Sequence, residues 1–157
     1  MKSMPFPRSL PVRIVLAAAA LGLAGCGSLN AAPAPLAGDL LSAPTTLNLN
    51  GQVLKVAAQP QLSGAVFSVR VRVAAGSAAP NVSSLKVMGM YAITDSGVWK
   101  APRMTALTSG CAAQLCARGS GGAGDLQSGE RTQIVTELQD SHGRTYWLRD
   151  ARTRAVK

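Results

Sequence analysis

The stretch AVFSVRVRV, Ala65–Val73, decides the fold because apolar and polar side chains alternate along it. In an extended chain, successive side chains point to opposite faces. One face therefore carries the apolar residues Phe67, Val69, Val71 and Val73. The other face carries Ser68, Arg70 and Arg72. This pattern predicts a strand of an antiparallel sheet with one face against a core and the other in solvent.

Weaker alternation recurs along most of the remaining chain. The segments that show it are Thr46–Ala58, Ser84–Thr94, Gly97–Leu107, Arg131–Asp140 and Arg144–Val156. Clusters of Gly, Pro, Ser and Asp separate them and predict turns, among them AQPQLSG and ARGSGGAGD, whose part GSGGAG (Gly119–Gly124) reads as a flexible loop. No segment has a long helical stripe. Six or seven short strands over residues 46–157 predict an all-β fold, a single antiparallel β-sandwich domain.

The last two predicted strands, GERTQIVTELQDSHGRTYWLRDA, close as a hairpin about the turn Asp140–Gly143. This pair resembles the final strands of bacterial immunoglobulin-like or fibronectin type III-like modules. The resemblance implies an immunoglobulin-like sandwich of about seven strands. The chain departs from that pattern because no cysteine pair is spaced to bridge two sheets, and because Trp99 falls late for the usual buried tryptophan.

The first 25 residues have the layout of an export signal. Residues 1–13 carry three basic residues, and the apolar run Ile14–Leu23 follows, whereas every acidic residue comes after Cys26. A membrane-spanning helix needs about 20 apolar residues, so this run is too short to span. Its length suits the apolar region of a signal peptide.

The residues that end this signal, Leu23, Ala24, Gly25 and Cys26, resemble a bacterial lipobox. The resemblance implies cleavage between Gly25 and Cys26, lipid on the Cys26 sulfur, and a lipid-anchored place in the cell envelope. Gly27 after the cysteine implies the outer membrane, with the side of that membrane left open. The alternative is ordinary secretory cleavage near Ala24, which leaves Cys26 unmodified.

Residues 26–45 follow the predicted cleavage site and are rich in Ala and Pro. They predict a flexible tether between the lipid and the domain. Docking of Leu36–Leu41 as a short helix or edge segment is the alternative, because the leucines would otherwise be exposed to water.

Cys111 and Cys116 lie five positions apart between glycines, and an exported protein meets oxidising conditions. We expect a disulfide that fixes a local loop. A redox pair typically has the closer C-x-x-C spacing. A metal site needs further His or Cys ligands, and His142 is the one histidine of the chain. No metal and no cofactor are therefore expected.

The residues Asp140, Ser141 and His142 contain the letters of a hydrolase triad. Adjacent side chains in a turn point apart and cannot form the required relay of hydrogen bonds. The carboxylates elsewhere are dispersed. We therefore expect no catalytic residues and a protein that is not an enzyme.

Alternation also predicts an exposed apolar patch. If Ile134, Leu138, Tyr146 and Leu148 face the core, Trp147 faces outward. The same scheme turns Leu85, Val87, Tyr91 and Ile93 inward. The resulting candidate site for a protein partner comprises Met88, Met90, Val135 and Trp147, rimmed by Lys86 and Arg149. The alternatives are that the tether or the loop of Cys111 covers these residues, or that a bulge reverses the register.

The chain is basic, with 16 Lys and Arg against 7 Asp and Glu. A candidate surface for an anionic envelope component, such as lipid headgroups, lipopolysaccharide or an acidic polymer, comprises Arg70, Arg72, Arg149, Arg152, Arg154 and Lys157. Solvated strand faces also carry such charges without any ligand. Nucleic acid is not expected, because the compartment argues against it and aromatic residues do not interleave with the basic ones. The expected function is a noncatalytic binding, adhesion or envelope-assembly module, with attachment to an anionic component as the alternative.

Overall fold

The structure, a computed structural model, describes residues 35–76, 82, 84–111 and 114–157. The predicted signal peptide, the cleavage site at Gly25, the lipidation site at Cys26 and the first part of the predicted tether lie outside the described residues. Within the part of the chain that the structure describes, we find no candidate for a membrane-spanning helix.

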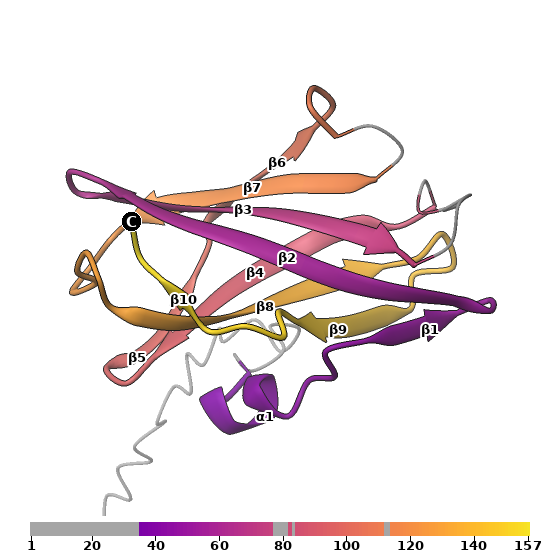
Figure 1. The fold of residues 1–157 in the computed structure, drawn as a ribbon, viewed down its shortest axis with the longest axis horizontal. Helices are drawn as coiled ribbons and strands as arrows, with labels where there is room; N and C mark the ends of the chain where they lie inside the picture. The colour runs from indigo at the N-terminus through magenta and orange to yellow at the C-terminus, as the bar shows by residue number, and fades with distance from the viewer. Residues whose placement is uncertain (1–34, 77–81, 83, 112–113) are drawn as a thin grey trace, which may run out of the picture. The chain divides into compact units, whose positions relative to one another are not determined.

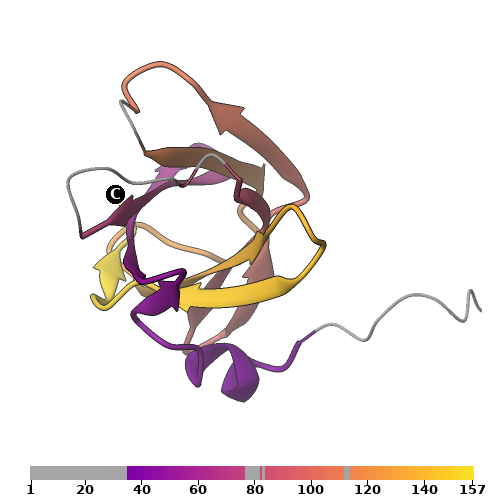
Figure 2. The same cartoon turned by 90° about the vertical axis from the view of Figure 1, so that its right-hand side faces the viewer.

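The described chain folds as two antiparallel sheets that face each other, as Figures 1 and 2 show. The first sheet has the order β1-β2-β3-β7-β6, and the second has the order β10-β8-β4-β5, with β9 also paired to β8. The bounds are β1 Leu47–Leu49, β2 Gln52–Ser63, β3 Val66–Ala75, β4 Lys86–Thr94, β5 Gly97–Lys100, β6 Arg103–Leu107, β7 Leu115–Gly122, β8 Arg131–Gln139, β9 Thr145–Arg149 and β10 Arg154–Ala155. The predicted all-β sandwich is confirmed.

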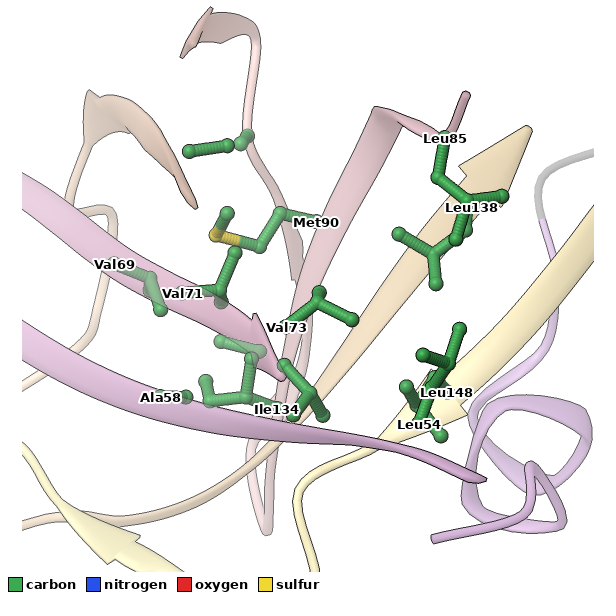
Figure 3. Close-up of a cluster of buried hydrophobic side chains, with 14 of the residues drawn as sticks. Leu54, Ala58, Val69, Val71, Val73, Leu85, Met90, Ile134, Leu138 and Leu148 are labelled. Atoms are coloured by element: carbon green, nitrogen blue, oxygen red, sulfur yellow. The ribbon is translucent and has the colours of Figure 1, made fainter. Parts of the chain in front are cut away.

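Strand β3 lies at the centre of the first sheet, between β2 and β7. Its four predicted inward residues, from Phe67 to Val73, are fully buried, while Arg70 and Arg72 are exposed. Figure 3 shows three of its valines pointing between the sheets toward residues of the second sheet, including Met90 and Ile134. The alternation of apolar and polar residues in the sequence therefore matches the alternation of buried and exposed side chains along β3.

The segment Thr46–Ala58, read as one strand, is a hairpin. Asn50 and Gly51 both have positive φ, 51° and 79°, as the tight turn between antiparallel strands requires. Strand β2 then continues through residues 58–63, which were predicted as a turn. Pro60 is tolerated there because β2 pairs with β3 on one side only, so that its missing N–H falls on the side away from β3.

The prediction of a flexible loop at Gly119–Gly124 is wrong, because most of that segment is the end of β7, between β3 and β6. Its glycines allow close packing. A Cβ added to Gly119 would lie 2.7 Å from the Ala101 Cβ and 3.0 Å from the Met90 Sδ. At Gly121 it would collide with the ring of Pro102. The glycines of this segment allow neighbouring residues to pack closely against the strand, whereas their frequency in the sequence had suggested a flexible loop.

Strand β4 contains a bulge between Val87 and Gly89, where the pairing with β8 shifts by one residue. Met88 is the extra residue, and it is 49% exposed. After the bulge the two faces of the strand exchange, so that Met90 and Ala92 enter the main core. The predicted inward orientation of Tyr91 and Ile93 is wrong for the same reason.

A short helix, α1 (Ala37–Leu41), packs on the outer face of the second sheet. Leu40 is buried there with Ala43, against residues of β4, β8 and β9 that face away from the main core, namely Tyr91, Ile93, Val135 and Trp147. Figures 1 and 2 show α1 on the side of the domain away from β6 and β7. Of the two readings of Leu36–Leu41, the docked helix is the one that forms, and the domain begins before residue 46.

Candidate anion-binding groove

The predicted apolar patch around Trp147 does not form. Met90 and Val135 are both fully buried, Met90 in the main core and Val135 beneath α1. Trp147 is half-buried against the same helix, and its ring centroid lies 5.5 Å from that of Tyr91. Only Met88 and Lys86 of this set are exposed. Two of the alternatives raised for this surface, a bulge and a covering segment, therefore both occur.

Arginines gather instead on the outer face of the first sheet. Arg70 of β3 is directly opposite Arg118 of β7, and Arg72 follows two residues along β3 on the same face. All three are exposed. The Arg118 guanidinium donates to the Ser68 hydroxyl at 3.4 Å, and no hydrogen bond or ion pair to a carboxylate involves any of the three among the described residues. Like charges directly opposite on neighbouring strands destabilise a sheet.

The C-terminal segment adds more basic residues along the edge of β2. Asp150 is 2% exposed and holds this segment in place. Its carboxylate accepts hydrogen bonds from the Ala58 N–H of β2 at 2.9 Å, the Arg152 N–H at 3.0 Å and the Arg154 Nε at 2.8 Å. Further along, the Leu62 N–H donates to the Lys157 carbonyl at 2.6 Å. Asp150 thus fixes the position of Arg152 and Arg154 beside the sheet.

Between the sheet face and this segment runs a surface depression, which we call the basic groove. Its larger part, about 740 Å³, lies between Arg70 and Arg118 on the sheet and Arg154 and Lys157 on the C-terminal segment. A smaller part of about 430 Å³ continues past Arg70 to Arg72 and Arg152. The groove is therefore lined by six basic residues: Arg70, Arg72, Arg118, Arg152, Arg154 and Lys157.

The charge of the groove is strongly unbalanced. No acidic side chain lines either part of the groove. The Asp150 carboxylate contacts the groove residue Arg154, but it already accepts hydrogen bonds from the Arg154 Nε and from two backbone N–H groups. One of the six basic residues, Arg154, is thus neutralised locally. The other cations are available for an anion, and Gln59 and Ser68 line the groove as polar neighbours.

The disulfide between Cys111 and Cys116 is present, with the two Cα atoms 6.0 Å apart. Cys116 pairs with Arg72 across the strands, and it is buried although it lies on the outer face. Gly110, next to the disulfide, lines the groove, and a Cβ added there would lie 3.4 Å from the Arg70 guanidinium. Gly110 and Cys116 therefore contribute to one wall of the groove beside the disulfide.

Five of the six basic residues named from the sequence line this groove. Arg149 does not, because its Nε donates to the Ala43 carbonyl at 3.1 Å beside α1. Arg118 was missed, since it belongs to the segment read as a loop. The available signal lay before the glycines, where Leu115 and Ala117 face the core and alternate with Cys116 and Arg118 on the outer face.

The turn Asp140–Gly143 is structural. The Asp140 carboxylate accepts from the His142 N–H at 2.9 Å, the Arg144 N–H at 3.0 Å and the Arg144 Nε at 2.8 Å, and also from the Tyr146 hydroxyl. Partial desolvation acts to raise the pKa of Asp140, but these hydrogen bonds outweigh it and lower the pKa to about 2. The His142 side chain contacts Ser141 and not the carboxylate.

Among the residues that the structure describes, no group of three or more His, Cys, Asp or Glu side chains is placed to hold a metal ion. No protein-family model matches the chain, and no curated protein matches it in sequence.

Proposed function

We propose that this protein is a lipid-anchored envelope lipoprotein whose β-sandwich binds an anionic envelope component through the basic groove, without catalysing a reaction. The lipid anchor rests on the lipobox resemblance at Cys26 and the signal-like residues before it. The strand order of the two sheets, with β2, β3, β7 and β6 facing β5, β4, β8 and β9, supports an immunoglobulin-like assignment for the domain.

The observation that carries the proposal is the direct opposition of Arg70 and Arg118 within a groove that no acidic side chain lines. An arrangement that weakens the sheet is expected where a bound anion stabilises it. Guanidinium groups suit this task because their donors match the geometry of carboxylates, sulfates and phosphates.

The other candidate function is binding of a protein partner at Trp147. The apolar surface proposed for it is not exposed, since Met90 and Val135 are buried. The basic groove is the surface feature that remains open and chemically distinctive among the described residues. Its position on a rigid sheet also favours binding, because β3 and β7 hold Arg70 and Arg118 at a fixed separation.

The test is binding of a synthetic polyanion, poly-glutamate, to the mature protein at low ionic strength. The double variant Arg70→Gln/Arg118→Gln should bind about tenfold or more weakly, since two charge-assisted contacts are lost. The control, Lys86→Gln/Arg103→Gln, removes the same net charge from exposed residues that do not line the groove.

Equal losses in the two double variants would show that net charge, and not the groove, attracts the polymer. Binding that is unchanged by either variant or by raising the salt concentration would contradict the proposal altogether, because exposed charges are screened by salt.

A further inference from the structure

The position of α1 bears on where the anion comes from. Helix α1 packs on the outer face of the second sheet, while Arg70, Arg72 and Arg118 project from the outer face of the first. These two faces of a sandwich point in opposite directions. The chain therefore enters the domain on the side away from Arg70, Arg72 and Arg118, as the separation of α1 from β7 in Figures 1 and 2 also indicates.

The segment between the proposed lipid on Cys26 and the start of the described domain at Pro35, which we call the lead, is short. From Cys26 to Pro35 there are nine residue steps. A fully extended chain covers at most about 3.4 Å per residue, which gives roughly 30 Å. Docking of α1 is what makes the lead this short, since the predicted tether ran to residue 45.

The lead would have to span a large distance for the face that carries Arg70, Arg72 and Arg118 to lie on the membrane that holds the lipid anchor. Two packed sheets are about 10 Å apart, and a helix layer adds roughly another 10 Å, before any side chains are counted. With the side chains, the depth from α1 to the guanidinium groups of Arg70, Arg72 and Arg118 is roughly 30 Å, and the lead must also pass around an edge of the sandwich. The depth of the domain alone therefore equals the greatest length of the extended lead, which leaves no length for the path around the edge.

We infer that the basic groove faces away from the membrane that anchors the protein and binds a polymer carrying repeated carboxylate, sulfate or phosphate groups beyond that leaflet. The inference rests on the proposed function, both its lipid at Cys26 and its anion groove. The shape of the groove agrees with a polymer, because its two parts share Arg70 and Arg154 and run on continuously from Lys157 to Arg72. A chain of anions can follow such a path, whereas a flat headgroup layer meets a depression only at its rim.

The test uses the mature lipidated protein bound to vesicles of phosphatidylcholine, with and without about 30% phosphatidylglycerol, at an ionic strength near 0.1 M, where the Debye length is about 10 Å. Retention of labelled poly-glutamate by the floated vesicles is measured. We expect the anionic lipid to change the affinity less than about twofold after correction for vesicles without protein, because the groove does not reach its own leaflet.

The matched comparison carries about 20 Gly and Ser residues inserted between Asn30 and Ala31, which adds up to about 70 Å of reach. In that variant the groove can turn onto its own membrane, so anionic lipid should compete with the polymer and weaken its binding fivefold or more.

Equal competition in the natural and the lengthened protein would overturn the inference, and so would failure of the protein to float with the vesicles. Failure of the proposed groove function looks different, because the protein on phosphatidylcholine vesicles would then bind poly-glutamate no better than its Arg70→Gln/Arg118→Gln variant.

Discussion

Arg70 and Arg118 lie directly opposite one another on neighbouring strands, both exposed on the outer face of the first sheet. Each would be more stable beside a neutral or acidic neighbour, since like charges in this position are destabilising. Replacing one of the two is therefore expected to stabilise the domain while weakening the proposed binding of anions.

The first prediction concerns this pair. Arg118→Gln should raise the free energy of unfolding by about 0.2–1 kcal/mol, because the opposed charge is removed while the side chain still spans the sheet face. Urea unfolding at low ionic strength measures the change, and added salt should shrink it. Arg103→Gln, opposite Ser120 on the same sheet, is the control and should have little effect. A destabilised Arg118→Gln protein would show that Arg118 has a structural role.

A second prediction concerns the glycines of β7. Gly119→Ala should destabilise the domain by about 1–3 kcal/mol, because the new methyl group meets Ala101 and Met90 within the packed core. Gly122→Ala, three residues along, meets nothing within 4 Å and has no positive φ, so it should be neutral or slightly stabilising. Thermal unfolding followed by circular dichroism compares the two. Equal effects would mean that backbone flexibility, and not packing, explains the glycines.

The third prediction tests the docking of α1. Leu40 is 2% exposed and Leu36 is 72% exposed, although both are leucines of the same short segment. Leu40→Ala should cost about 2–3 kcal/mol and shift the Trp147 fluorescence to longer wavelength, as α1 leaves the sheet. Leu36→Ala should leave both unchanged. An unshifted spectrum in Leu40→Ala would show that Trp147 is shielded by something other than the helix.

The fourth prediction is a dependence on pH. The pKa of Asp140 is lowered to about 2 in the folded protein, so its carboxylate stabilises the fold above its unfolded pKa of about 3.9. This contribution should be lost as the pH falls from about 4 toward 2. Asp140→Asn should therefore lower the melting temperature at pH 6 and flatten its decline between pH 4 and pH 2. Asp125→Asn, at an exposed carboxylate, should retain the decline of the natural protein.

The sequence predicted those elements in which local pattern and burial agree. In β3 each apolar residue faces the core, so strict alternation identified both the strand and the exposed arginines. Strand β7 was not predicted, because its inward residues Gly119 and Gly121 have no side chains to mark a buried face. What excludes a larger residue there is the position of Ala101 and Pro102, which is set by the tertiary fold.

The fate of the predicted Trp147 patch has a different physical cause. A single extra residue at Met88 exchanges the faces of β4, and alternation cannot reveal it, since both Met88 and Met90 are apolar. Trp147 did point away from the main core as predicted. Its covering by α1 depends on a contact between segments more than 100 residues apart, which no local pattern contains.

The attachment of the C-terminal segment to β2 also covers a sheet edge that would otherwise be open. Strand β2 is 12 residues long, and only Gln52–Leu54 pair with β1, which leaves most of one edge to the C-terminal segment. A long open edge is a template for strand addition by a second chain, and so for aggregation. The Asp150 carboxylate and the Lys157 carbonyl occupy two of its N–H groups, and Pro60 between them offers none. Loss of Asp150 would then be expected to favour strand addition along β2, and so fibril formation, more than in the natural chain.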